Sequence, residues 1–347
     1  MDHFALHPIS SITIRNGEYT TRMGTRNHQV VFCLHQAVFK RRLQFLFIML
    51  NIELPLAGIT VWAPGIVALG LAVGFLTGMF GVGGGFIITP FLKIVFGLPY
   101  PLAVGCGLAQ ILVTSSLSTW HHWRNRSVDA LLGIIIAAGA IGGTETGVRI
   151  QTQLKTAGTM VLAGRTFDIL DFVLNLLFLV LMLVVGITIL LETALSDGDE
   201  AETGIGLALR EVRVPPMLSF GRSGIAAMSL WIPLGLSFGV GILTGLMGVG
   251  GGFINFPALV YLLGVPTLVA VGTSAFQIVF ASAYGAVRHA AQGHVELMLV
   301  GLLLLGSVGG VRLGARLSHI VGGRKVRRLF TLVLFAGILL IVWDFIR

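Results

Sequence analysis

Charged residues are scarce in this 347-residue chain: Asp, Glu, Lys and Arg make up 11% of it, against roughly 25% in soluble domains. Hydrophobic residues make up 55%, and the mean hydropathy is +0.92. A soluble core cannot bury this much apolar sequence, so lipid is expected to solvate much of the surface. The composition therefore indicates a membrane protein.

Cysteine is almost absent as well. Cys33 and Cys106 provide neither a disulfide framework nor the ligand spacing of a metal site. The sequence contains no H-E-x-x-H, no G-x-S-x-G and no nucleotide motif of an ATP-driven pump. We therefore predict no enzyme activity, no cofactor and no metal site.

The formal net charge of +8 does not indicate nucleic-acid binding. Its Lys and Arg residues lie in short loops beside apolar runs, where the cytoplasmic preference of basic residues explains them. The expected partners are the lipid bilayer and a small anion, and the sequence leaves the oligomeric state open.

One glycine-rich phrase occurs twice. Residues 74–92 are GFLTGMFGVGGGFIITPFL and residues 241–259 are GILTGLMGVGGGFINFPAL, with 13 of 19 positions identical at an offset of 167. The same offset continues over about 75 residues and pairs Pro99 with Pro266, Gly105 with Gly272, Gln110 with Gln277, Ser115 with Ser282, His122 with His289, and Arg149 with Arg316. This register predicts two homologous repeats.

The hydrophobic segments define the expected architecture. They cover residues 64–82, 85–98, 102–123, 129–149 and 167–191, and then 229–249, 252–265, 268–290, 295–316 and 326–346. We predict an all-α polytopic protein with about 8–10 transmembrane segments. The segments that begin at Phe86 and Phe253 are shorter than the 20 or so residues of a full span, so they are predicted to be half-helices.

The relative orientation of the two repeats has two opposing indications. Five spans in each half predict an inverted repeat, which is common in transporters. The loops 149–166 and 316–328 are both basic, which favours the same side of the membrane for both. We favour the inverted repeat.

Four regions follow from these patterns. Residues 1–48 are basic and lack a signal-peptide pattern, so we interpret them as a disordered extension or as the product of a start codon misassigned upstream of Met49. Residues 49–191 form the first predicted repeat. Residues 192–222 carry acidic residues and a Pro-Pro pair that suit a solvated linker. Residues 223–347 form the second predicted repeat.

The glycine phrases are the candidate substrate site. Each glycine in a helix costs about 1 kcal/mol relative to alanine, so adjacent glycines predict a helix break. Free N–H groups at the start of the next helix attract anions, and two such breaks would flank one ligand. Close packing is the alternative, because Gly70, Gly74 and Gly78 have small-xxx-small spacing. The candidate residues are Gly83, Gly84, Gly85, Gly250, Gly251 and Gly252.

Paired polar residues inside apolar segments add to this candidate site. The amides of Gln110 and Gln277 and the hydroxyls of Ser115 and Ser282 can donate to an oxyanion without carrying charge into lipid. Interhelical hydrogen bonding is the alternative for the glutamines. The hydroxyls are expected to bond their own helix backbone.

Basic residues at the end of the third segment of each half are a candidate vestibule that concentrates anions. They are His122 and Arg124 in the first half, and His289 and Arg288 in the second. Interfacial anchoring is the favoured alternative, and it places these residues at the membrane surface. Glu145 lies near a segment end, where we expect surface exposure rather than a role in proton coupling.

The doubled glycine phrase, with the glycine, proline and Gln residues that follow it, resembles the TauE/SafE sulfite exporter family, also called TSUP or DUF81. The resemblance covers residues 51–346, and LPLAGITVWAPG at 54–65 resembles the start of one bacterial subgroup. It implies a multi-pass inner-membrane permease for sulfite or organosulfonates such as sulfoacetate and taurine-related compounds. Several members of the family move other anions, so the identity of the substrate does not carry over.

The membrane potential gives a direction for such a permease. Moving one charge through 100 mV is worth about 2.3 kcal/mol, so a negative cytoplasm drives an anion outward. The near absence of acidic residues in the segments favours export or facilitated diffusion. The alternatives are a transporter of another small anion, a cation or metal transporter that uses carbonyls at the broken helices, and a membrane-embedded enzyme or assembly subunit.

Overall fold

A computed structural model describes residues 50–162, 165–195, 212–321 and 323–346. The predicted extension 1–48 and most of the predicted linker 192–222 lie outside these residues. The described residues from Ile52 onward form one compact unit, and the description below concerns that unit.

The described chain is built mainly from helices, as the hydrophobic segments predicted. The helices are α2 (Ala63–Phe80), α3 (Gly85–Ile94), α4 (Tyr100–Arg124), α5 (Ala130–Thr156), α6 (Ile169–Leu195), α8 (Trp231–Met247), α9 (Gly252–Pro257) with its π-helical continuation η1 (Ala258–Leu262), α10 (Thr267–Ala291), α11 (Leu297–Val321) and α12 (Gly323–Ile346). Within the described residues, six are long and apolar enough to cross a membrane: α2, α4, α5, α6, α10 and α11. The bundle is therefore a polytopic α-helical membrane protein.

The short helices after the glycine phrases do not reach across a bilayer. With 10 residues, α3 is only about 15 Å long at 1.5 Å per residue, against a hydrocarbon core of about 30 Å. The matching segment is divided into the six-residue α9 and the five-residue η1. Each follows a run of glycines that ends the preceding helix, so both are the broken helices that the sequence predicted.

Three two-stranded hairpins were not predicted. They pair β1 (Asn51–Leu54) with β2 (Ile59–Trp62), β3 (Thr159–Leu162) with β4 (Arg165–Asp168), and β5 (Met217–Phe220) with β6 (Ile225–Ser229). The strands are too short to show a period-two pattern in the sequence. The turns of the first and third hairpins contain Gly58 and Gly224, whose φ angles of 63° and 70° favour glycine.

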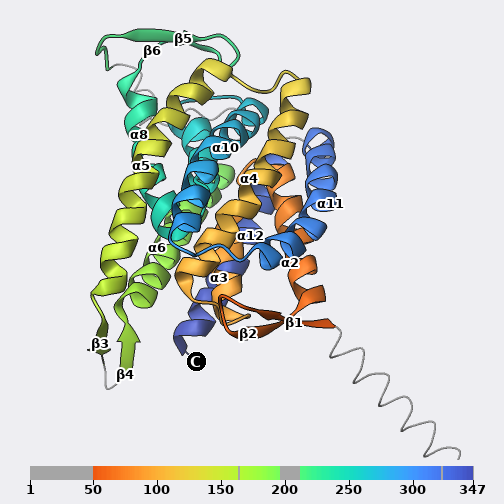
Figure 1. Cartoon of the computed structure of the whole chain (residues 1–347). Helices are drawn as coiled ribbons and strands as arrows, with labels where there is room; N and C mark the ends of the chain where they lie inside the picture. Colours follow the sequence, from red (N-terminus) through yellow and green to blue (C-terminus); the bar gives the residue numbers. More distant parts are fainter. Residues whose placement is uncertain (1–49, 163–164, 196–211, 322, 347) are drawn as a thin grey trace, which may run out of the picture. The chain divides into compact units, whose positions relative to one another are not determined.

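The first and third hairpins lie at opposite ends of the bundle (Figure 1). Helix α2 follows β2 at one end, and α8 follows β6 at the other, so the two helices run in opposite directions. Their sequences correspond at the offset of 167. Equivalent segments of the two halves thus have opposite orientations in the described unit.

Close packing joins helices from different halves of the sequence. A Cβ atom on Gly74 or Gly78 of α2 would lie less than 3.0 Å from the backbone of Ser307 or Val311 of α11. Real side chains do not approach a backbone this closely, so the two helices touch through glycine. The small-xxx-small spacing of α2 therefore serves contact with α11.

The second half repeats this contact with the roles exchanged. A Cβ atom on Gly241 or Gly245 of α8 would lie less than 3.0 Å from the backbone of Ala140 or Thr144 of α5. Each of these four positions is 167 residues from its equivalent in the α2–α11 pair. Each tight pair thus contains one helix from each half: α2 packs on α11, and α5 packs on α8. The two halves therefore interlock and do not form separate bundles.

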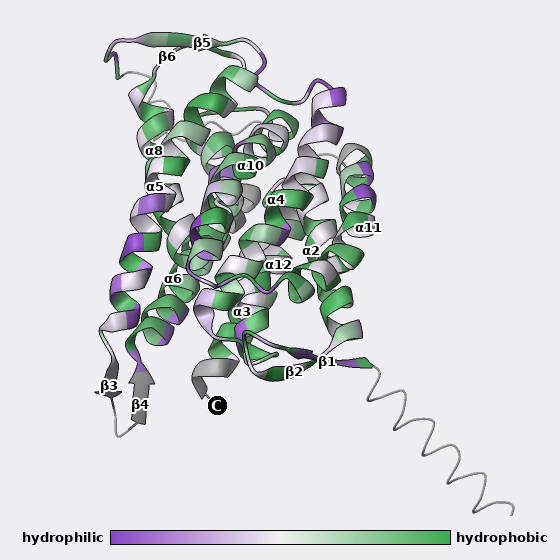
Figure 2. Ribbon diagram, viewed as in Figure 1, coloured by the Kyte–Doolittle hydropathy of each residue, from purple (hydrophilic) through white to green (hydrophobic). Residues whose placement is uncertain are grey.

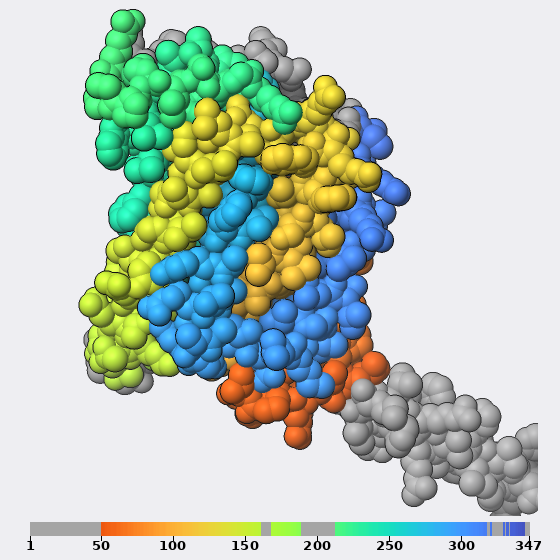
Figure 3. Space-filling view, turned by 45° about the horizontal axis from the view of Figure 1, so that its top comes forward, coloured from red at the N-terminus to blue at the C-terminus, as the bar shows by residue number. Residues whose placement is uncertain are grey.

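The outside of the bundle is apolar. Figure 2 shows hydrophobic colour over most helices, with a hydrophilic stretch on α5 toward β3. Large apolar side chains such as Leu305 and Leu339 are 73% and 70% exposed, which suits contact with lipid acyl chains. On the face shown in Figure 3, α10 lies between α5 and α4.

Candidate functional site

The glycine phrases form two loops with the same backbone conformation. Helices α2 and α8 each end at a left-handed glycine, and two more follow in each loop. The φ angles are 65°, 79° and 68° at Gly81, Gly83 and Gly84, and 72°, 74° and 80° at Gly248, Gly250 and Gly251. Only glycine adopts this conformation readily, so the composition of the loops follows from their shape.

The two loops pack directly against each other. A Cβ atom on Gly85 would lie 2.5 Å from the carbonyl oxygen of Gly248, and one on Gly252 would lie 2.6 Å from the backbone of Val82. The rings of Phe86 and Phe253 stack with their centroids 5.4 Å apart.

The central helices α4 and α10 flank this loop crossing symmetrically. Side chains of Ile111 and Ile278 both lie beside Gly83 and beside Gly250, at 3.1 and 3.3 Å from a Cβ atom built at either glycine. The crossing of two chain breaks is therefore enclosed by one apolar residue from each half.

The amide of Gln277 stands next to the second loop. Its Oε1 accepts a hydrogen bond of 2.7 Å from Nδ2 of Asn255, and a Cβ atom on Gly251 would lie 3.8 Å from its Nε2. Among the described residues, this buried Nε2 has no hydrogen-bond partner. The second loop thus has a free amide donor beside it.

The amide of Gln110 is the reverse of that of Gln277, because its donor is bonded and its acceptor is left over. Its Nε2 donates to Oγ of Ser307 at 2.8 Å, and that hydroxyl donates its single proton to the carbonyl of Leu303. Ser307 can therefore only accept from Gln110, which leaves Oε1 of Gln110 buried and without a partner in the described chain. The two glutamines contact different helices, α11 and α9, so the described contacts form two polar clusters.

The paired hydroxyls mostly bond their own helices. Ser282 donates to the carbonyl of Ile278 at 2.6 Å, whereas Oγ of Ser115 is buried and has no partner among the described residues. Thr77 and Thr244, beside the two loops, donate one turn back along their helices at 2.9 and 3.0 Å. Of these hydroxyls, only that of Ser115 has a proton left to donate to a ligand.

The histidines are not at the surface, contrary to the expectation from the sequence. His122 and His289 are fully buried. The Cβ atom of His122 lies 3.1 Å from a Cβ atom built on Gly272, near the start of α10. The Cβ atom of His289 lies 3.1 Å from one built on Gly105, near the start of α4. The absence of a side chain at those glycines leaves room for the imidazoles between α4 and α10.

The four candidate vestibule residues lie in two separate places. The end of α10 packs beside the start of α4, and the end of α4 packs beside the start of α10, so the two helices are antiparallel. Arg124 and Arg288, close to these two ends, therefore lie apart. Arg124 is exposed and Arg288 is partly buried.

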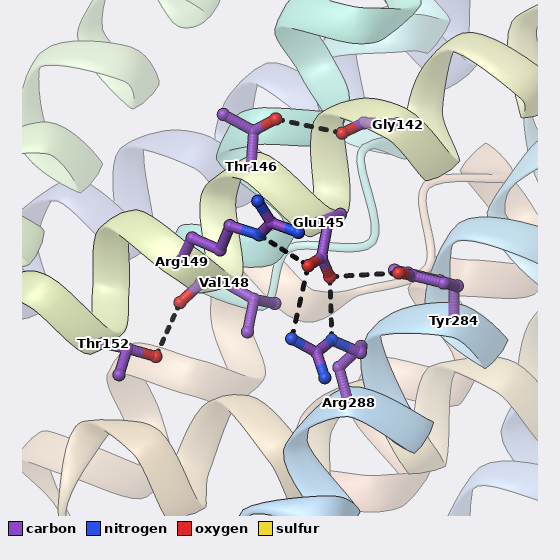
Figure 4. A network of polar contacts seen from close by, with 8 residues as sticks. All are labelled: Gly142, Glu145, Thr146, Val148, Arg149, Thr152, Tyr284 and Arg288. Atoms are coloured by element: carbon purple, nitrogen blue, oxygen red, sulfur yellow. Dashed lines mark hydrogen bonds and ion pairs between the residues drawn. The ribbon is translucent and has the colours of Figure 1, made fainter.

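Glu145 lies at the centre of a polar network that the sequence did not reveal (Figure 4). Its carboxylate accepts from Nε of Arg149 at 2.7 Å, from Nε and Nη2 of Arg288 at 2.8 and 3.3 Å, and from the hydroxyl of Tyr284 at 3.0 Å. Its side chain is 21% exposed, so it lies at the surface of the bundle but is only partly accessible. One signal for this network was present in the sequence: Glu145 and Arg149 on α5, and Tyr284 and Arg288 on α10, are each spaced i,i+4.

Two buried carboxylates that the sequence analysis passed over anchor the hairpins. Oδ2 of Asp129 accepts from the backbone N–H and the hydroxyl of Ser223, at 3.1 and 2.8 Å, in the β5–β6 turn. Oε2 of Glu296 accepts from the N–H of Leu56 at 3.0 Å, in the β1–β2 turn. Both pairs are related by the offset of 167, so equivalent carboxylates hold equivalent turns.

The loop after α10 adds one more basic contact. Nζ of Lys155 lies 3.3 Å from Nε2 of His294. Partial burial, with the charge of Lys155, lowers the pKa of His294. A neutral His294 is able to accept a hydrogen bond from the ammonium group at this end of α5.

The fold and these contacts define the class: a multi-pass membrane transporter with two broken helices crossing at its centre. Residues 66–341 match the family model described as "Sulfite exporter TauE/SafE". The chain therefore belongs to this family and is a transporter, not an enzyme. In the described part of the chain, no three His, Cys, Asp or Glu side chains are grouped to hold a metal ion.

Relatives cover most of the chain. It is 27% identical to the probable membrane transporter protein YunE of Bacillus subtilis over 78% of this chain and 93% of the relative. It is 29% identical to YjnA of the same organism over 80% and 98% of the two chains, and 24% identical to a probable membrane transporter protein of Xylella fastidiosa over 78% and 91%. No solved structure matches the chain.

Proposed function

We propose that the chain is a permease that moves sulfite, an organosulfonate or a related small anion outward across a bacterial inner membrane. In this proposal the anion binds beside the crossing of the two glycine loops. Two inverted repeats, residues 49–191 and 223–347, open that site alternately to the two sides of the membrane.

The observation that carries the proposal is the unpartnered amide donor of Gln277. A buried donor without a partner costs about 1–3 kcal/mol, and an oxyanion oxygen would remove that cost. The hydrogen bond from Asn255 engages Oε1, which leaves the N–H groups of Gln277 available beside Gly251. Amide N–H groups recognise an oxyanion without a buried cation, which suits a substrate that must also leave.

The paired contacts support alternating access. The tight pairs α2–α11 and α8–α5 have equivalent glycine contacts, and their equivalent helices run in opposite directions. If each half adopted the conformation of the other half, a state open to one side of the membrane would become a state open to the other side.

The acidic residues suit outward movement driven by the membrane potential. The carboxylates of Asp129 and Glu296 are buried but engaged in anchoring hairpin turns. Glu145 is engaged by two arginines. In the described chain these groups serve structural contacts, so export down the electrical gradient needs no additional coupling group.

Transport by purified protein in liposomes tests the proposal. Vesicles loaded with labelled sulfite and, separately, with sulfoacetate are expected to lose label faster with the protein than without it, and faster still when the inside is made negative. No potential-dependent efflux of any of these anions would contradict the proposal.

Substitutions in the loops test the position of the site. Gly84→Leu and Gly251→Leu place side chains in a left-handed conformation beside Thr77 and Thr244, and both are expected to abolish transport. Gly239→Leu is the matched control, since a Cβ atom there meets nothing within 4 Å. Full activity of both loop variants would remove the loops from the transport path.

One observation favours a cation instead. The free carbonyl oxygen of Gln110 suits a metal or ammonium ion better than an anion. Equilibrium binding of labelled sulfite and of divalent metal ions to the purified protein distinguishes the two functions. Saturable metal binding that Gln110→Leu removes, with no binding of sulfite, would favour the cation.

A further inference from the structure

The network around Glu145 has more donors than its carboxylate can accept. A carboxylate has about four acceptor sites, and Arg149, Arg288 and Tyr284 fill four. The two guanidinium groups have five N–H donors each, of which three donors are used in all. The network also carries one more positive charge than negative charge.

Water reaches this network. The side chains of Arg149, Arg288 and Glu145 are 72%, 36% and 21% exposed. Exposed ion pairs contribute little to stability, so fold stability alone does not account for placing three charges on membrane helices. An accessible, incompletely satisfied pair of guanidinium groups is a common anion-binding arrangement.

The network lies where α5 leaves the apolar part of the bundle. Residues 130–143 of α5 contain no charged residue, whereas Glu145, Arg149 and Lys155 follow in the rest of the helix. Figure 2 shows this change as the hydrophilic stretch of α5 toward β3. The network therefore faces the aqueous side at that end of the bundle.

The equivalent positions in the other half have no carboxylate. At the offset of 167, Arg312 corresponds to Glu145, and Arg316 corresponds to Arg149. Leu117 and His121 correspond to Tyr284 and Arg288. Arg312 and Arg316 are exposed, and neither is within ion-pair distance of an acidic residue in the described part of the chain. Among the described residues, a carboxylate is therefore present in the α5–α10 network but not at the equivalent positions of α11 and α4.

We propose that Arg288, Arg149 and Tyr284 form a second subsite for the transported oxyanion, and that Glu145 competes with that anion for it. This inference rests on the proposed function. When the anion arrives, it replaces the carboxylate on Arg288 and Tyr284, and Glu145 remains paired with Arg149 on its own helix. This competition lowers the affinity of the subsite for the anion, so the anion is released again and is not trapped there.

Neutralising Glu145 tests this competition. Glu145→Gln removes the charge with little change in shape, and it is expected to tighten the equilibrium binding of labelled sulfite to the purified full-length protein by on the order of tenfold. Arg288→Gln is expected to weaken binding by about the same factor, and Tyr284→Phe by less. Glu53→Gln is the matched control, because it neutralises an exposed carboxylate outside the network.

The outcomes separate this inference from the proposed function. Unchanged or weaker binding by a folded Glu145→Gln protein overturns the subsite, even if the wild type transports sulfite. Tighter binding without transport by the wild type supports the subsite and contradicts the permease. Thermal unfolding of each variant identifies a purely structural role: a lower melting temperature for Glu145→Gln with unchanged sulfite affinity also overturns the subsite.

Discussion

The corner where α5 meets α10 and the corner where α4 meets α11 hold equivalent residues of the two halves, but they differ in charge. The first has Glu145 between Arg149 and Arg288. The second has Arg312 and Arg316, with no acidic partner in the described part of the chain. Most glycine contacts within the tight helix pairs, by contrast, are the same in both halves.

The difference follows from what each position must do. A glycine at a helix crossing cannot gain a Cβ atom without moving a backbone, and most of these positions are glycine in both halves; Gly70, whose equivalent is Ser237, is an exception. A partly exposed side chain at a corner meets no such limit, and it is free to differ between the halves. The shared contacts thus support a common architecture, and the charged corners give the molecule two different ends.

The largest expected effect tests the shared architecture. Gly143→Leu and Gly310→Leu place side chains less than 3.0 Å from the backbones of Phe238 and Leu71. Each is expected to cost about 3 kcal/mol or more, because two packed helices must separate. Thermal unfolding and the yield of monodisperse protein measure this, with Gly301→Leu as a control in open space. If either variant were as stable as the wild type, the α5–α8 and α2–α11 pairs would not depend on glycine in the same way.

The hairpin anchors give the next largest effect. Asp129→Asn removes the charge from contacts to Ser223 and to the N–H of Leu132, whereas Glu296→Gln weakens one contact to Leu56. We expect losses of about 2 and about 1 kcal/mol in the free energy of unfolding. Differential scanning measurements of both proteins check the order, and a larger loss for Glu296→Gln would contradict the contacts.

The two glutamines test the polarity of the central clusters. Gln277→Leu removes the free donor, so the sulfite concentration for half-maximal efflux is expected to rise about tenfold. Gln110→Leu removes a donor that is already bound to Ser307, and a rise of less than about threefold is expected. Equal effects in the liposome assay would show that both amides contact the anion.

The smallest effect concerns the exposed arginines. Arg149→Gln and Arg316→Gln change side chains on the outside of the two corners. Because an exposed ion pair is worth about 0–1 kcal/mol, we expect each to change the free energy of unfolding by less than about 0.5 kcal/mol. A clear loss for Arg149→Gln alone would assign the Glu145 network a structural role.

Much of the fold was predictable from local signals. Apolar length predicted the membrane helices, and three adjacent glycines predicted the breaks before α3 and α9. The hairpins escaped prediction because four-residue strands give no periodic signal. The position of His122 escaped as well, because its burial depends on Gly272 of another helix.

The candidate site was predictable only in part. The predicted repeat pairs Gln110 with Gln277, but Asn255 and Ser307 have no polar equivalent at the offset of 167, and they orient the two amides differently. The partners of Glu145 on α10 lie 139 and 143 residues away. Contacts over such separations depend on helix packing, which no local pattern encodes.

The sequence by itself determined the class of protein, the register of 167 residues and the places where helices must break, because apolar length and glycine conformation act locally. Only the tertiary structure decided that the two loops cross, that each half packs its glycines on the other, and that Glu145 meets Arg288. Those contacts join residues from distant segments, and their energies exist only once the backbone has brought the helices together.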